Sequence, residues 1–166
     1  MTKDLIYKLA AQAGKALQRR NLMLVTAESC TGGGVGEAVT RVPGSSEWFE
    51  RGFITYTYIS KREMLGVKVR TLAKSGAVSE QATREMAQGA LKHSHAQIAL
   101  AVSGTAGPSG GTREKPVGTV CLAWVRKNGE VISETRHFKG NRASVRRQAV
   151  KRALQGVLAL LASEKK

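Results

Sequence analysis

Ser29 stands in the stretch TAESCTGGG, residues 26–34, where a short apolar run meets three consecutive glycines. A serine at such a turn can attack a substrate carbonyl carbon if a neighbouring base takes its proton, and backbone N–H groups beside it can bind the developing oxyanion. Thr31, Gly32 and Gly33 are the candidate donors. The alternative is a purely structural N-cap, because Ser or Thr at a strand-to-helix turn most often satisfies a free backbone N–H and does no chemistry. The stretch is neither a Walker A loop nor a dinucleotide-binding fingerprint.

A base for this serine is the second requirement. The three histidines of the chain are poorly placed, because they fall at the end of an expected helix or in a late strand. A lysine can serve instead when burial lowers its pKa. Lys61 follows the stretch GFITYTYI, and Tyr56 or Tyr58 is close enough in sequence to share a hydrogen-bond network with it. The alternative is an ordinary solvent-exposed lysine.

A second glycine-rich loop, SGTAGPSGGTREKPVGT, follows another apolar run at residues 103–119. Long loops inside compact domains are more often functional than idle, and their N–H groups can hold a phosphate or a carboxamide. Arg113 or Lys115 would add positive charge, and Arg142, near the start of the last expected helix, could do the same. The substrate-binding residues that we expect in this loop are Ser103, Gly104, Gly107 and Gly110.

The elements that must position these loops alternate between helix and strand in the first part of the chain. Hydrophobic spacing predicts helices over residues 4–20, 35–42, 79–96 and 143–162. Runs rich in apolar and β-branched residues predict strands over residues 22–27, 52–59, 97–105, 117–125 and 131–138, the last two joined by a tight turn at Asn128 and Gly129. This order predicts an α/β fold, a three-layer α/β/α sandwich with a mixed, mostly parallel sheet.

Length and composition indicate one domain over residues 1–166, in a cytoplasmic protein without a signal peptide or membrane span. Cys30 and Cys121 lie far apart and suggest neither a disulfide framework nor a metal site, so no metal or cofactor is expected. The formal net charge of +15 attracts anions of any kind. Nucleic acid is an unlikely partner, because aromatic residues are few and the positive charges are spread along the chain, thickening only at residues 141–152.

Several motifs in order resemble one family. AESCTGG at residues 27–33, GAVSE at 76–80, SGTAGPSGG at 103–111 and KPVGTV at 115–120 are similar to the C-terminal domain of CinA, the family of nicotinamide-nucleotide amidohydrolases. The resemblance covers almost the whole chain. It implies a stand-alone domain with the three-layer fold and hydrolysis of nicotinamide mononucleotide to nicotinic acid mononucleotide and ammonia.

The resemblance also implies roles for particular residues. The family's serine nucleophile falls on Ser29, its lysine base on Lys61, its tyrosine on Tyr56 and an arginine on Arg142, which would bind the phosphate or the reaction intermediate. It implies no cofactor, and it suggests a homo-oligomer.

The chain departs from the family pattern beside the expected base. Relatives usually carry Asn and Glu where this chain has Tyr58 and Ile59. A nucleotide-binding paralogue with altered catalysis is therefore the alternative to an active amidohydrolase, and a basic nucleic-acid-binding accessory protein is a more remote one. The first alternative predicts nucleotide binding without ammonia release, and the second predicts DNA affinity that falls steeply with salt.

Overall fold

The computed structural model describes residues 2–164, and the side chains of residues 5–164. Its centre is a five-stranded sheet in the order β2-β1-β3-β4-β5. The strands are β1 Leu24–Glu28, β2 Phe49–Ile54, β3 Ile98–Gly104, β4 Thr119–Arg126 and β5 Val131–His137. Pairs β2–β1 and β1–β3 are parallel, whereas β3–β4 and β4–β5 are antiparallel. The sheet is therefore mixed, as predicted.

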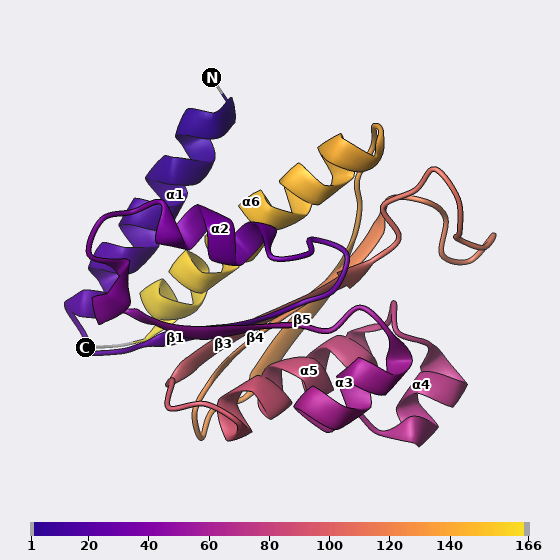
Figure 1. Cartoon of the computed structure of the whole chain (residues 1–166), viewed down its shortest axis with the longest axis horizontal. Helices are drawn as coiled ribbons and strands as arrows, with labels where there is room; N and C mark the ends of the chain where they lie inside the picture. Colours follow the sequence, from indigo (N-terminus) through magenta and orange to yellow (C-terminus); the bar gives the residue numbers. More distant parts are fainter. Residues whose placement is uncertain (1, 165–166) are drawn as a thin grey trace.

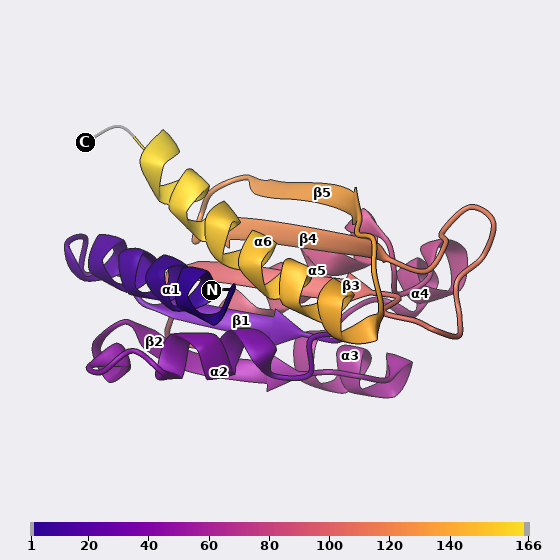
Figure 2. The same cartoon turned by 90° about the horizontal axis from the view of Figure 1, so that it is seen from above.

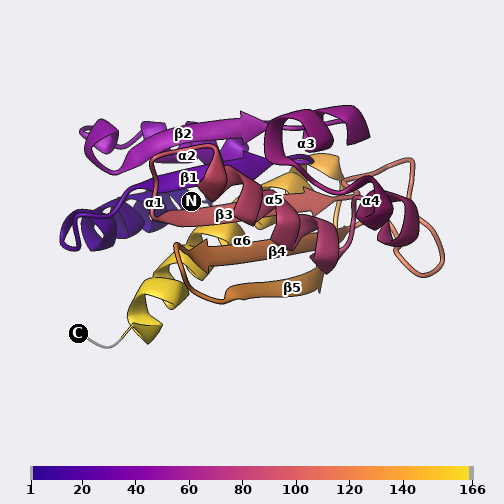
Figure 3. The ribbon, with the colours of Figure 1, turned by 90° about the horizontal axis from the view of Figure 1, so that it is seen from below.

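Helices cover both faces of this sheet (Figure 1). The helices are α1 Thr2–Gln18, α2 Gly34–Thr40, α3 Tyr58–Leu65, α4 Val69–Ser75, α5 Glu80–Lys92 and α6 Arg142–Ser163, with a short 3-10 helix at Ser45–Glu47. Figure 2 shows α1, α2 and α6 over one face, and Figure 3 shows α3, α4 and α5 over the other. The predicted three-layer α/β/α sandwich is confirmed.

Two apolar cores fill the spaces between the layers. On the α6 side, the predicted stripe of α6 is fully buried, with Val145, Ala149, Ala153, Val157 and Leu161 all at most 1% exposed. On the α5 side, the inward residues are Ala82, Met86 and Ala90, as predicted. Ser79 caps α5 as predicted, its hydroxyl accepting a hydrogen bond from the Ala82 N–H.

One predicted element is wrong in its second half. The predicted strand over residues 52–59 ends at Ile54, and Tyr58 already begins α3. Thr57 starts this helix with a capping box, in which its hydroxyl accepts from the Ser60 N–H and the Ser60 hydroxyl accepts from the Thr57 N–H. The cap outweighs the β preference of Tyr58 and Ile59, and it places Lys61 on a helix rather than after a strand.

The parallel strands bring three loops to one edge of the sheet. Glu28, the last residue of β1, is in register with Ile54 of β2 and Val102 of β3. The ladder continues one step further, because the Ser29 N–H donates to Val102 O and the Thr55 N–H donates to Glu28 O. The segments after β1, β2 and β3 therefore meet at this edge, the usual place for a ligand in such sheets.

Candidate active site

Ser29 and Lys61 meet at the carboxyl edge of the sheet. Lys61 Nζ lies 2.9 Å from Ser29 Oγ and 2.6 Å from the carbonyl oxygen of Thr55. The Lys61 side chain reaches them from α3, one turn after the Thr57 cap. Lys61 is 1% exposed and Ser29 is 7% exposed. The capped helix thus holds a buried lysine directly against the serine hydroxyl.

Burial changes the acidity of this lysine. Desolvation disfavours the ammonium form and lowers the pKa of Lys61 to about 8. A lysine with that pKa is roughly one-tenth neutral at pH 7, and this neutral fraction is enough to accept a proton from the adjacent Ser29 hydroxyl. No carboxylate pairs with Lys61 among the salt bridges of the described residues, so its ammonium form gains no compensating ion pair.

Cys30, next to the serine, is not a competing nucleophile. Its side chain is buried, and burial raises the pKa of the Cys30 thiol to about 12. Because the thiolate is the reactive form, this cysteine stays inert near neutral pH.

The glycine turn after Ser29 presents N–H groups at the same place. The Gly32 N–H donates to Ser29 O and the Gly34 N–H to Thr31 O, whereas the N–H groups of Thr31 and Gly33 have no acceptor within residues 2–164. Gly32 and Gly33 have φ values of 58° and 99°, a left-handed conformation that glycine adopts without strain. Of the three predicted oxyanion donors, Thr31 and Gly33 are therefore available, and the Gly32 N–H is occupied.

The predicted tyrosine and arginine contact each other. Arg142, the first residue of α6, donates from Nη2 to the Tyr56 hydroxyl at 2.9 Å and from Nη1 to Gly107 O at 2.8 Å. Among the described residues no hydrogen bond joins Tyr56 to Lys61, and the Tyr56 side chain is largely exposed. This arginine ties the segment after β2 to the second glycine-rich loop.

The other predicted loop residues are divided between the site and its surroundings. Ser103 is buried in β3 directly after Val102, whose carbonyl accepts the Ser29 N–H, and Gly104 is the last residue of β3. Gly110 lies further out in the exposed loop. Lys115 reaches another segment, because its Nζ donates to Ser75 O at 2.6 Å. The loop between β3 and β4 extends beyond the ends of these strands (Figure 1).

Two charged residues beside Ser29 were not predicted from the sequence. Glu28 is buried, and its carboxylate accepts from the Thr31 hydroxyl at 2.6 Å, from the Val35 N–H at 2.8 Å and from the Gly36 N–H at 3.1 Å. Arg146 of α6 donates to the carbonyl oxygens of Cys30 and Thr31, in the turn that follows Ser29. An acidic residue ending an apolar strand was a visible signal for Glu28; Arg146 stood unmarked within the basic residues 141–152.

Among residues 2–164, no three His, Cys, Asp or Glu side chains gather closely enough to bind a metal ion. In the same part of the chain, no helix is both long enough and apolar enough to span a bilayer.

The sequence and the fold match known proteins over nearly their whole length. Residues 6–161 match the family description "CinA C-terminal domain". The chain is 51% identical to nicotinamide-nucleotide amidohydrolase PncC of Escherichia coli K12, covering 93% of this chain and 94% of the relative. It is 52% identical to the Pseudomonas putida protein of the same name, covering 95% and 98%.

Solved structures agree with these sequence matches. The competence/damage inducible protein CihA of Agrobacterium tumefaciens superposes with a TM-score of 0.91 at 46% identity, covering 94% of this chain and 95% of that one. The competence damage-inducible protein A of Klebsiella pneumoniae gives a TM-score of 0.93 at 38% identity, covering 96% and 99%.

Proposed function

This chain belongs to the CinA C-terminal domain family, and we propose that it hydrolyses the carboxamide of nicotinamide mononucleotide with Ser29 as nucleophile and Lys61 as base. The observation that carries this proposal is the 2.9 Å contact between Lys61 Nζ and Ser29 Oγ in a buried setting. The products are nicotinic acid mononucleotide and ammonia. We infer the substrate from the relatives named nicotinamide-nucleotide amidohydrolase, and we infer the mechanism from the contact between Ser29 and Lys61.

The first half of the reaction acylates the serine. Neutral Lys61 takes the hydroxyl proton as Ser29 Oγ attacks the carboxamide carbon, and the carbonyl oxygen becomes an oxyanion. The N–H groups of Thr31 and Gly33 stabilise that charge, because they have no other acceptor in the described chain. Protonated Lys61 then gives its proton to the leaving nitrogen, the carbon–nitrogen bond breaks, and ammonia departs.

The second half returns the serine to its starting state. A water molecule attacks the acyl ester carbon while Lys61 again accepts a proton, and a second oxyanion forms at the same N–H groups. The bond between the carbon and Ser29 Oγ breaks, and Lys61 returns the proton to the serine. One water is consumed for each carboxylate and ammonia formed.

Arg142 and Tyr56 are proposed to bind the substrate beside this pair. The Arg142 guanidinium donates to the Tyr56 hydroxyl at 2.9 Å and to Gly107 O at 2.8 Å, so it joins the segment after β2 to the second glycine-rich loop. A guanidinium can hold a phosphate through two parallel hydrogen bonds, and a phenol can donate a third. Ser103, Gly104 and Gly110 are proposed to complete the substrate-binding loop.

The direct test measures ammonia release from nicotinamide mononucleotide by the purified protein and by a Ser29→Ala variant. We expect turnover by the parent and none by the variant, and rapid mixing with acid should trap an acyl ester on Ser29, visible by mass spectrometry. Turnover that survives in Ser29→Ala would exclude this serine as the nucleophile. Binding of the nucleotide without ammonia release by the parent would exclude the amidohydrolase.

The altered paralogue is the second candidate, since Tyr58 and Ile59 depart from the family pattern. Both side chains are more than half exposed on α3, and the Tyr58 hydroxyl accepts a hydrogen bond from the Ala77 N–H at 3.3 Å. Neither is hydrogen-bonded to Ser29 or Lys61. This placement favours a changed surface around an intact catalytic pair, and therefore an active enzyme.

Self-association and a cytoplasmic location are further proposals for this protein. Ile54, Tyr58 and Ile59 expose apolar surface beside the edge strand β2, where a second copy could pack. Analytical ultracentrifugation would show a dimer or larger oligomer, and a monomer at micromolar concentration would contradict the proposal.

A further inference from the structure

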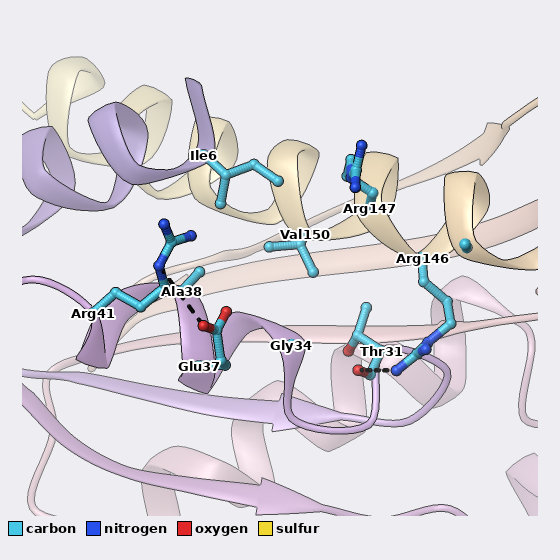
Figure 4. A pocket seen from close by; sticks show the side chains of 10 residues that line it. Ile6, Thr31, Gly34, Glu37, Ala38, Arg41, Arg146, Arg147 and Val150 are labelled. Carbon is cyan, nitrogen blue, oxygen red and sulfur yellow. Dashed lines mark hydrogen bonds and ion pairs between the residues drawn. The ribbon is translucent and has the colours of Figure 1, made fainter. Parts of the chain in front are cut away.

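We infer that Arg146 is a positioning residue that orients the oxyanion-binding N–H group of Thr31. Its Nε lies 3.1 Å from Cys30 O and its Nη2 lies 3.1 Å from Thr31 O. One guanidinium therefore donates to two successive carbonyl groups of the turn at residues 29–33, which we call the nucleophile turn. Figure 4 shows the side chain descending from α6 toward Thr31. The inference rests on the proposed function of the same site.

The geometry of the peptide bond gives this contact its consequence. In a trans peptide the C=O and the N–H of the same unit point in opposite directions. The Cys30 carbonyl points toward Arg146, on the α6 side of the sheet, so the Thr31 N–H of that unit points away from α6. Ser29 Oγ is held by Lys61, which belongs to α3 in the opposite layer. The Thr31 N–H therefore faces the side on which the oxyanion forms.

The charge of Arg146 supports a dedicated role. Within residues 2–164 Arg146 forms no ion pair, and its guanidinium donates to two neutral carbonyl oxygens. Arg146 is exposed overall, yet its guanidinium bonds to these carbonyl oxygens instead of extending into solvent. Its positive charge polarises the Cys30 peptide and strengthens the Thr31 N–H as a donor.

Glu28 fixes the same turn from within. Its carboxylate holds the Thr31 hydroxyl and the first N–H groups of α2, so the Thr31 side chain is fixed while Arg146 holds the backbone. The two residues leave the turn little freedom to rotate its peptide planes. Loss of Arg146 should consequently impair the chemical step more than substrate binding.

A groove beside Arg146 makes the inference testable by chemical rescue. The groove lies between α1, α2 and α6, has a volume of about 420 Å³, and includes Thr31, Arg146 and Val150 in its lining. Arg41, at its far end, is engaged with Glu37 at 3.7 Å and with the ring of Tyr7. In the Arg146→Ala variant the arginine side chain is missing, and a guanidinium ion from solution could enter the groove and occupy that space (Figure 4).

The experiment compares Arg146→Ala, Arg146→Lys and the neighbouring Arg147→Ala in ammonia release from nicotinamide mononucleotide. We expect kcat of Arg146→Ala to fall about 10- to 100-fold with KM changed less than threefold, and millimolar guanidinium to restore at least a third of the loss on a logarithmic scale. Arg146→Lys, which can reach one carbonyl, should be intermediate, and Arg147→Ala should match the parent. Parent-like kcat in Arg146→Ala, or a loss in a folded variant without guanidinium rescue, would overturn the inference.

A second readout separates this inference from the proposed substrate. The release of p-nitrophenolate during phosphorylation of Ser29 by diethyl p-nitrophenyl phosphate needs the same oxyanion donor but no nucleotide. A parent that reacts with this reagent without hydrolysing nicotinamide mononucleotide would refute the proposed function alone. Reaction of Arg146→Ala at the parental rate would refute the positioning role. If Arg146→Ala fails to fold, a parental rate in Arg146→Lys refutes it equally.

Discussion

At the scale of single residues, the protonation of Lys61 should control activity. Desolvation places its pKa at about 8, so kcat/KM should rise about tenfold per pH unit below pH 8 and level off above it. Lys61→Arg keeps the positive charge but cannot release its proton, and we expect activity to fall by at least about 1,000-fold. Ammonia release measured from pH 6 to pH 9.5 checks both expectations.

The matched control for this profile is Lys92→Arg, at the end of α5 and away from the site. It should keep the parental profile. A parental profile without an inflection near pH 8, or substantial activity in Lys61→Arg, would show that another group takes the proton.

The same lysine should also leave a signature in stability. Its pKa in the folded protein is lower than the ordinary value of 10.5, so between about pH 8 and pH 10.5 the unfolded chain binds more protons than the folded one. The free energy of unfolding contributed by Lys61 therefore rises with pH across this window, by about 3 kcal/mol in total. Below pH 8 both states are protonated and the full destabilisation is present.

Lys61→Met tests this linkage. We expect the difference in unfolding free energy between variant and parent, measured by urea denaturation, to favour the variant at pH 7 and to shrink toward pH 10. A difference that stays constant over this range would mean that the lysine keeps an ordinary pKa in the folded protein.

At the scale of secondary-structure elements, the capping box of α3 is what delivers Lys61 to Ser29. Thr57→Ala removes the hydroxyl that accepts the Ser60 N–H, and we expect a loss of about 1 kcal/mol in unfolding free energy. Thr40→Ala is the control, because its hydroxyl only bonds back to carbonyl groups within α2 and should change stability by less than about 0.5 kcal/mol. Equal losses of unfolding free energy in Thr57→Ala and Thr40→Ala, measured by chemical denaturation, would show that the cap does not stabilise α3.

The packing of α5 against the end of α3 is equally specific. A Cβ atom added at Gly89 would lie 1.8 Å from the carbonyl oxygen of Leu65, a backbone atom that cannot move aside cheaply. Gly89→Ala should therefore cost about 3 kcal/mol or more in unfolding free energy, despite the higher helix propensity of alanine. At Gly36 of α2 the added Cβ would make an ordinary contact of 3.7 Å with Glu28, so Gly36→Ala should be neutral or stabilising. Thermal denaturation of both variants decides between packing and propensity.

These helices differ in how strongly the local sequence predicts them. The long stripe of α6 and the Ser79 cap of α5 are strong local signals, and the structure confirms both. The segment 55–65 is harder, because Tyr58 and Ile59 favour strands by residue type while the Thr57 and Ser60 pair favours a helix start. A capping box extends over four residues and is easily overlooked beside a longer aromatic run.

At the scale of the whole molecule, the site is assembled from segments that are far apart in sequence. Ser29 follows β1, Lys61 comes from α3 in one layer, and Arg146 comes from α6 in the other layer. The motifs around Ser29 and Lys61 allowed both to be predicted as partners before the fold was known. The contact of Arg146 with the Cys30 carbonyl spans 116 residues, and no local pattern encodes it.

The net charge of +15 should act on the substrate at this scale, through attraction for its phosphate. The field of many dispersed charges is screened over about 10 Å at 0.1 M salt, so raising NaCl from 20 to 300 mM should raise KM for nicotinamide mononucleotide several-fold and leave kcat unchanged. Nicotinamide riboside carries the same carboxamide and pyridinium cation without the phosphate, so the protein's charge should repel it and its KM should not rise with salt. If both compounds respond alike, salt acts on the protein rather than on the phosphate. A KM for the nucleotide that is insensitive to salt would mean that local contacts such as Arg142, and not the field of the molecule, capture the substrate.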